Sequence, residues 1–166
     1  MRIIKLLLFI FFIFFLVIVN VSWNILPSSL NILFIFIIIN ILKNRYNNKA
    51  LYVWLGIIFG GIFLDLYSVL PDGLYLASFL LMALILYKFI LSEFSISNHF
   101  HVFIISSVAC LFFKIIVLLL SRLSYYLGLS DILLNVSFLY ILSFAVLNSF
   151  LIFLLYGWNI RYKIKR

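Results

Sequence analysis

Few residues of this chain could carry chemistry, and two of them stand inside apolar segments. Asp65 follows a glycine-rich apolar run, and Lys114 lies within another apolar run. A charge at membrane depth costs about 2.5–3.5 kcal/mol on insertion scales, so such a group is expected to face the interior of a helix bundle or to have a partner. These two groups could form an ion pair, bind a proton or bind a substrate.

Asp65 and Lys114 are expected at similar depths. In helices that begin at Leu51 and Val102, they lie about 21 Å and about 18 Å along the axis, at ~1.5 Å per residue. We therefore predict an intramembrane ion pair between Asp65 and Lys114. The pair could fix which helices meet, bind a small ligand or tie the bundle to another protein.

The other residues that could form a metal, disulfide or catalytic site give only weak signals. His99 and His101 lie near Glu93 in a polar stretch, but nothing fixes a third or fourth metal ligand, so a solvated loop is the simpler interpretation. Cys110 is the single cysteine, which excludes a disulfide within the chain. No nucleophile with a partner base, phosphate-binding loop or haem spacing is visible. We expect neither an enzyme nor a bound cofactor or metal.

The composition predicts an integral membrane protein. Hydrophobic residues make up 68% of the chain and charged residues 10%, whereas soluble proteins carry about 25% charged residues. The runs 6–19 and 32–39 are apolar without alternation, which favours transmembrane helices over β-barrel strands. The predicted fold class is all-α, with residues 1–166 forming one transmembrane domain.

Turns and polar stretches divide the chain into six predicted spans. Pro27, Ser28 and Ser29 mark one turn, with the serines as candidate N-caps of the next helix. The predicted spans cover residues 6–26, 29–42, 51–69, 74–91, 102–121 and 132–158.

The basic residues predict the orientation. With the N-terminus inside, ten of the twelve Lys and Arg fall on the inner side, Arg122 on the outer side and Lys114 within a span. The positive-inside rule therefore places both termini in the cytoplasm. Because these residues lie between apolar runs, the net charge of +8 does not indicate nucleic-acid binding.

One hairpin combines the glycines with the acidic residue. Gly56, Gly60 and Gly61 allow close helix packing, either within the chain or against a helix of another protein. Pro71 and Gly73 predict a tight outer turn, because proline restricts φ and glycine permits positive φ.

This hairpin resembles that of the rod shape-determining protein MreD family of bacterial inner membranes. The resemblance covers about twenty residues, together with overall length and hydropathy, and Asp72 stands where the family usually has an apolar residue. The pattern reads Leu55-Gly56-x-x-x-Gly60-Gly61-x-x-Leu64-Asp65-Leu66-x-Ser68-x-x-Pro71-x-Gly73-Leu74.

The resemblance implies a non-enzymatic scaffold of the elongation machinery (elongasome) that supports cell shape and peptidoglycan synthesis. Its expected partners are an MreC-like membrane protein and, through it, MreB, RodA and a class B transpeptidase. The family's fold is similar to that of vitamin-binding subunits of energy-coupling-factor importers. A small-molecule binding subunit of such an importer is therefore the alternative.

Overall fold

The described chain forms six α-helices. A computed structural model describes residues 2–22, 31–44, 50–68, 70–90, 99–131, 134 and 136–164, and it contains no β-strand in these residues. The helices are α1 (Arg2–Ser22), α2 (Ile32–Asn44), α3 (Ala50–Tyr67), α4 (Leu74–Ile85), α6 (His99–Tyr126) and α7 (Phe138–Ile164), and a π-helical turn, Leu86–Ile90, continues α4. The predicted all-α class is confirmed.

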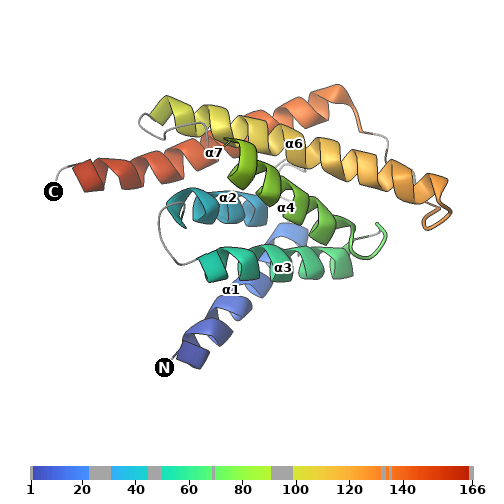
Figure 1. The fold of residues 1–166 in the computed structure, drawn as a ribbon, viewed down its shortest axis with the longest axis horizontal. Helices are drawn as coiled ribbons and strands as arrows, with labels where there is room; N and C mark the ends of the chain where they lie inside the picture. Colours follow the sequence, from blue (N-terminus) through green and yellow to red (C-terminus); the bar gives the residue numbers. More distant parts are fainter. Residues whose placement is uncertain are drawn as a thin grey trace.

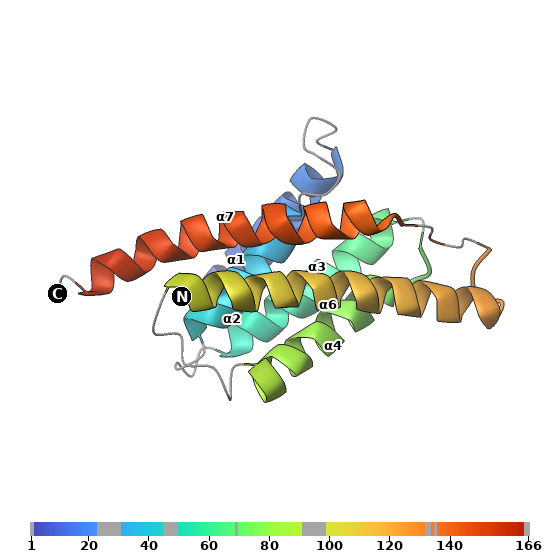
Figure 2. The ribbon, with the colours of Figure 1, turned by 90° about the horizontal axis from the view of Figure 1, so that it is seen from above.

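The helices pack as two antiparallel pairs around the short helix α2. Helices α6 and α7 run side by side, and α3 and α4 form a hairpin against them (Figures 1 and 2). Helix α1 crosses this arrangement obliquely and projects from it at the N-terminal end (Figure 1). Both termini lie toward one end of the long helices, and the turn between α3 and α4 lies toward the other.

Four buried phenylalanines join four of the helices. Phe34 of α2 lies 4.8 Å from Phe113 of α6 between ring centroids, and Phe79 of α4 lies 4.7 Å from Phe113. Phe144 of α7 completes the cluster at 5.6 Å from Phe34. Aromatic pairs at these distances contribute about 0.5–1.5 kcal/mol each beyond their burial, so this cluster holds α2 inside the bundle.

Among the described residues, three helices are long and apolar enough to cross a membrane, and they cover residues 4–21, 100–126 and 138–156. The other apolar helices are shorter and cover residues 32–43, 51–67 and 74–88. Helix α2 has 13 residues and is about 20 Å long, less than the ~30 Å hydrocarbon core. The class of protein that these helices define is an integral membrane protein.

The helix boundaries depart from prediction mainly in α6 and α7. Helix α6 begins at His99 and ends at Tyr126, so His99, His101 and Arg122 belong to a helix rather than to polar connections. It ends where Gly128 adopts φ +69°, with the Leu129 amide donating to the Ser124 carbonyl. This is a Schellman-type end, which needs a residue in the left-handed region. Helix α7 begins six residues later than predicted, at Phe138 rather than residue 132.

Candidate functional site

The Asp65 carboxylate binds the N-terminus of α4. Its Oδ1 accepts a hydrogen bond from the Tyr75 amide at 2.7 Å, and its Oδ2 accepts one from the Leu76 amide at 3.1 Å. Asp65 is 6% exposed. The carboxylate therefore bridges α3 to the first turn of α4.

Helix α4 needs this carboxylate because it has no cap of its own. The first amides of any α-helix lack intrahelical partners, and the N-cap of α4 is Gly73, which has no side chain to accept from them. An acidic oxygen on these amides also interacts favourably with the helix dipole. Charge-assisted hydrogen bonds of this kind contribute about 1.5–3 kcal/mol each, which offsets the cost of burying Asp65.

The turn before α4 brings Asp65 to these amides. The Leu74 amide donates to the Pro71 carbonyl at 3.2 Å, and Gly73 has φ +86°. This is the conformation of the third residue of a type II turn, which favours glycine. The Ser68 hydroxyl accepts from the Leu70 amide at 3.3 Å inside the same bend. The predicted tight turn at Pro71 and Gly73 is confirmed.

The glycines of α3 pack against helices of the same chain. A Cβ atom added at Gly61 would lie 2.6 Å from the Leu76 Cα, and one at Gly60 would lie 3.3 Å from the Leu33 side chain. One at Gly56 would meet only Phe9, at an ordinary contact distance of 3.8 Å. Gly61 is thus the close approach between α3 and α4, and the Gly60 face is occupied by α2 rather than left open to another protein.

Lys114 has other partners than the predicted one. Its ammonium donates to the Tyr140 hydroxyl at 3.4 Å and lies 4.8 Å from the Tyr140 ring centroid and 4.3 Å from that of Phe144. Asp65 and Lys114 therefore do not pair with each other in the described structure. The comparison of depths along the two helices could not predict this arrangement, because it considered only side chains. In the structure, main-chain amides of α4 occupy both oxygens of the Asp65 carboxylate.

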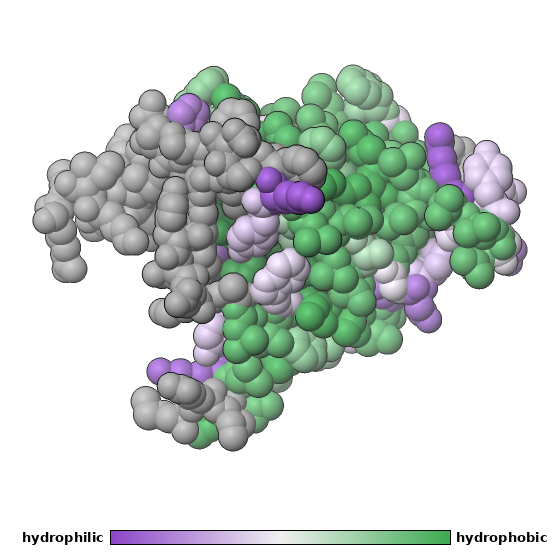
Figure 3. All heavy atoms as spheres, in the orientation of Figure 1, coloured by the Kyte–Doolittle hydropathy of each residue, from purple (hydrophilic) through white to green (hydrophobic). Residues whose placement is uncertain are grey.

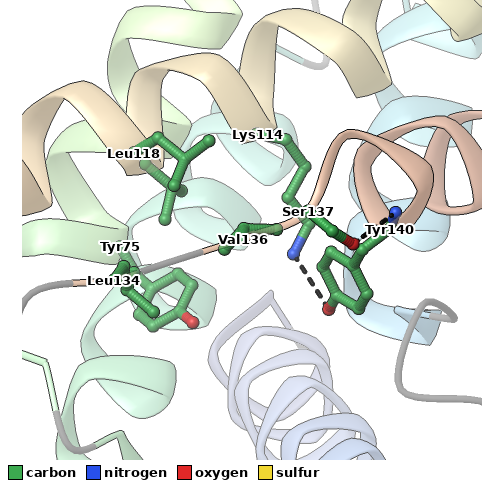
Figure 4. Close-up of a pocket in the computed structure, with 8 residues that line it drawn as sticks. Tyr75, Lys114, Leu118, Leu134, Val136, Ser137 and Tyr140 are labelled. Atoms are coloured by element: carbon green, nitrogen blue, oxygen red, sulfur yellow. Dashed lines mark hydrogen bonds between the residues drawn. The ribbon is translucent and has the colours of Figure 1, made fainter.

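Tyr75 connects the two charged groups. Its amide binds Asp65, and its ring lines a cavity of about 380 Å³ next to Lys114. The cavity lies among α4, α6 and the start of α7 (Figure 4), and its lining residues are Tyr75, Lys114, Val117, Leu118, Leu134, Val136, Ser137 and Tyr140.

Sequence reasoning did not single out Tyr75, Ser137 or Tyr140. Ser137 carried a usable signal, since it precedes an apolar run, and its hydroxyl accepts from the Tyr140 amide at 3.3 Å as the cap of α7. The two tyrosines carried none, because an interface or core position explains a tyrosine in a membrane helix equally well.

Three asparagines meet the N-terminus of α2. The Asn31 amide donates to Asn148 Oδ1 of α7 at 2.9 Å, and the Ile32 amide donates to Asn20 Oδ1 of α1 at 3.2 Å. The Asn31 side chain accepts from the Phe34 amide at 2.8 Å. Asn31 is therefore the cap of α2, whereas Ser28 and Ser29, the predicted caps, lie outside the described residues. A helix that starts inside an apolar bundle needs such protein partners, because no lipid can supply them.

The described residues offer no candidate metal site. In the part of the chain that the structure describes, no group of three or more His, Cys, Asp or Glu side chains could hold a metal ion. Glu93 lies outside the described residues, and His101 is half-buried in the first turn of α6.

Comparison of the chain with models of known protein families, with curated proteins and with solved structures finds no match. The assignment beyond a helical membrane protein therefore depends on the geometry above and on the hairpin pattern.

Proposed function

We propose that this chain is an MreD-like scaffold subunit of the bacterial elongation machinery, without enzymatic activity of its own. It would lie in the bacterial inner membrane as a multi-pass protein and contact an MreC-like partner. Through that partner it would act with MreB, RodA and a class B transpeptidase in peptidoglycan synthesis and cell shape.

The observation that carries this proposal is the role of Asp65 in the hairpin. The acidic residue of the family-like pattern has both carboxylate oxygens on amides of α4, and the adjacent Gly61 contacts the α4 backbone. A carboxylate held in this way stabilises a helix pair and is not poised to transfer a proton or attack a substrate. The pattern therefore fits a protein whose task is to present a stable surface.

The charge distribution supports a cytoplasmic location of both termini. Exposed Lys43 and Lys88 lie at the ends of α2 and of the turn after α4, toward the end of the bundle where the termini lie. Asp72 and Asp131 are exposed in the turns at the opposite end. Arg122, near the C-terminal end of α6, is exposed as well. The positive-inside rule relates orientation to the excess of Lys and Arg on one side and gives acidic residues little weight.

Thiol labelling tests the orientation. A chain with Cys110→Ser can carry a single new cysteine, either Asp72→Cys or Lys88→Cys, both at exposed positions. In intact cells, an impermeant maleimide should label the cysteine at 72 and not the one at 88, and after permeabilisation it should label both. Labelling of the cysteine at 88 alone in intact cells would contradict the proposed orientation.

We place the partner's membrane helix in the groove beside α1. Because α2 and α4 occupy the glycine face of α3, we choose the groove between α1 and Phe63 of α3, which is lined by apolar side chains and has a volume of about 510 Å³. Figure 3 shows one face of the molecule, and the described residues on that face are largely hydrophobic. The lining residues are Ile4, Leu7, Leu8, Ile10, Phe11, Phe14 and Phe63.

Co-purification with an MreC-like protein tests this placement with a matched pair of variants. Leu8 in the groove is 63% exposed and Leu119 on α6 is 61% exposed. Each can therefore be changed to tryptophan without disturbing the packing of the core. Leu8→Trp should reduce the recovered partner several-fold, and Leu119→Trp should not. Equal recovery of the partner with both variants would show that the partner does not bind in this groove.

A depletion experiment tests the function itself. Cells depleted of the chain should lose their rod shape and become round, and the wild-type copy should restore it. Gly61→Leu, which drives a side chain into the α4 backbone, should fail to restore shape, while Gly56→Ala should succeed. Unchanged cell shape after depletion would reject the proposal.

The cavity beside Lys114 favours the alternative of a vitamin-binding subunit of an energy-coupling-factor importer. Its volume of about 380 Å³ lies within the range of about 300–1,000 Å³ typical of small-molecule sites. Depletion that abolishes uptake of one vitamin and leaves cell shape unchanged would favour this alternative.

A further inference from the structure

The cavity beside Lys114 places a cation deep in the bundle. Lys114 stands fifteen residues after the first residue of α6 and twelve before the last, about 22 Å and about 18 Å along the axis at ~1.5 Å per residue. The ammonium, the Tyr140 hydroxyl and the Tyr75 hydroxyl point toward one space, from α6, α7 and α4 (Figure 4).

The cation has no counter-ion among the described residues. An ammonium has three donors, and that of Lys114 makes one long hydrogen bond, of 3.4 Å, to a neutral hydroxyl. The faces of two aromatic rings supply its remaining contacts. The buried acidic side chain of the hairpin, Asp65, is engaged by main-chain amides. Donors thus remain for an acceptor that enters the cavity.

Apart from Ser137, whose hydroxyl caps α7, the rest of the lining is apolar. The apolar residues are Val117, Leu118, Leu134 and Val136. A volume of about 380 Å³ is larger than a few waters need at ~30 Å³ each. An anionic group joined to a hydrocarbon portion matches both parts of this lining, whereas a free hydrophilic anion would match only the polar end.

We propose that this cavity binds the anionic head group of a membrane amphiphile, whose phosphate or carboxylate oxygens accept hydrogen bonds from Lys114 and Tyr75. The hydrocarbon part contacts the apolar lining. The site is independent of the scaffold function, because it uses neither the hairpin contact of Asp65 nor the groove beside α1.

Binding to the purified full-length chain in a neutral detergent tests this site. The probes are phosphatidylglycerol, oleate, inorganic phosphate and, as a zwitterionic reference, phosphatidylcholine, with binding followed by native mass spectrometry. Phosphatidylglycerol or oleate should bind at one site per chain. Lys114→Met should weaken that binding at least tenfold, and Lys114→Arg should retain it.

Two further variants separate the charge from the fold. Leu118→Trp fills the cavity while the charge stays, and it should also weaken binding at least tenfold; this variant decides the result if Lys114→Met does not fold. Lys88→Met removes an exposed lysine outside the cavity and should leave binding unchanged.

Three outcomes would overturn the proposal. One is equal binding of the anionic amphiphiles by the wild type and by the cavity variants. Another is binding of phosphatidylcholine as tight as that of phosphatidylglycerol, which would show that the site does not distinguish an anionic from a zwitterionic head group. The third is Lys114-dependent binding of inorganic phosphate without binding of either amphiphile.

Discussion

Replacing Asp65 by alanine tests the capping role of the carboxylate most directly. The substitution removes two charge-assisted hydrogen bonds to the α4 amides, together about 3–6 kcal/mol. It also removes the cost of holding a carboxylate at depth, about 2.5–3.5 kcal/mol on insertion scales. Taken lower end with lower end and upper end with upper end, the difference predicts a net destabilisation of about 0.5–2.5 kcal/mol.

Asparagine at the same position separates the two oxygens. Asp65→Asn keeps one acceptor oxygen and turns an NH2 donor toward the second amide. We therefore expect the stability of Asp65→Asn to lie between that of the wild type and that of Asp65→Ala. Asp72→Ala is the matched control, because Asp72 is an exposed acidic residue seven positions along the same hairpin. It should change stability by less than about 0.5 kcal/mol.

Equilibrium unfolding in mixed detergent and sodium dodecyl sulfate, followed by far-UV circular dichroism, measures these differences. The capping argument requires the order wild type, Asp65→Asn, Asp65→Ala from most to least stable. If Asp65→Ala were as stable as Asp72→Ala, the carboxylate would not be holding α4, and the reasoning from its two hydrogen bonds would be refuted.

Three other predictions use the same unfolding assay. Gly61→Ala should destabilise by about 1–3 kcal/mol through overpacking against the α4 backbone, whereas Gly56→Ala has room and should be neutral or stabilising by up to about 1 kcal/mol; equal effects would contradict the close approach. Asn148→Leu should cost about 1–3 kcal/mol by leaving the half-buried Asn31 amide, at the cap of α2, without its acceptor, and a neutral effect would show that the contact is dispensable. The double exchange Asp65→Lys with Lys114→Asp should be no more stable than either single exchange, since the two groups have separate partners; rescue by the double exchange would reinstate the ion pair.

Residue types predicted those features that depend on the chain locally. Composition is enough for helices in a membrane, since so few charges cannot cover a soluble surface. Pro71 and Gly73 are enough for the turn, because the left-handed conformation at the third position favours glycine. Helix ends were predicted less well: α6 continued through Arg122 because nothing before Gly128 stops it.

Side-chain partners between helices could not be read from the pattern. Depth along two helices predicted that Asp65 would meet Lys114, but depth says nothing about rotation or about main-chain groups. The amides of α4 need an acceptor because Gly73 supplies none. Only the turn that brings α4 beside α3 places the Asp65 carboxylate within reach of them.

The sequence by itself determined that the chain is helical and apolar, where its hairpin turns, and that a buried carboxylate must have a partner. Only the tertiary structure decided that this partner is the start of α4, that Gly61 packs against the α4 backbone, and that Lys114 faces a cavity instead of an acid. The physical reason is that turn geometry and hydropathy are properties of neighbouring residues, whereas hydrogen-bond partners depend on how helices rotate and approach one another.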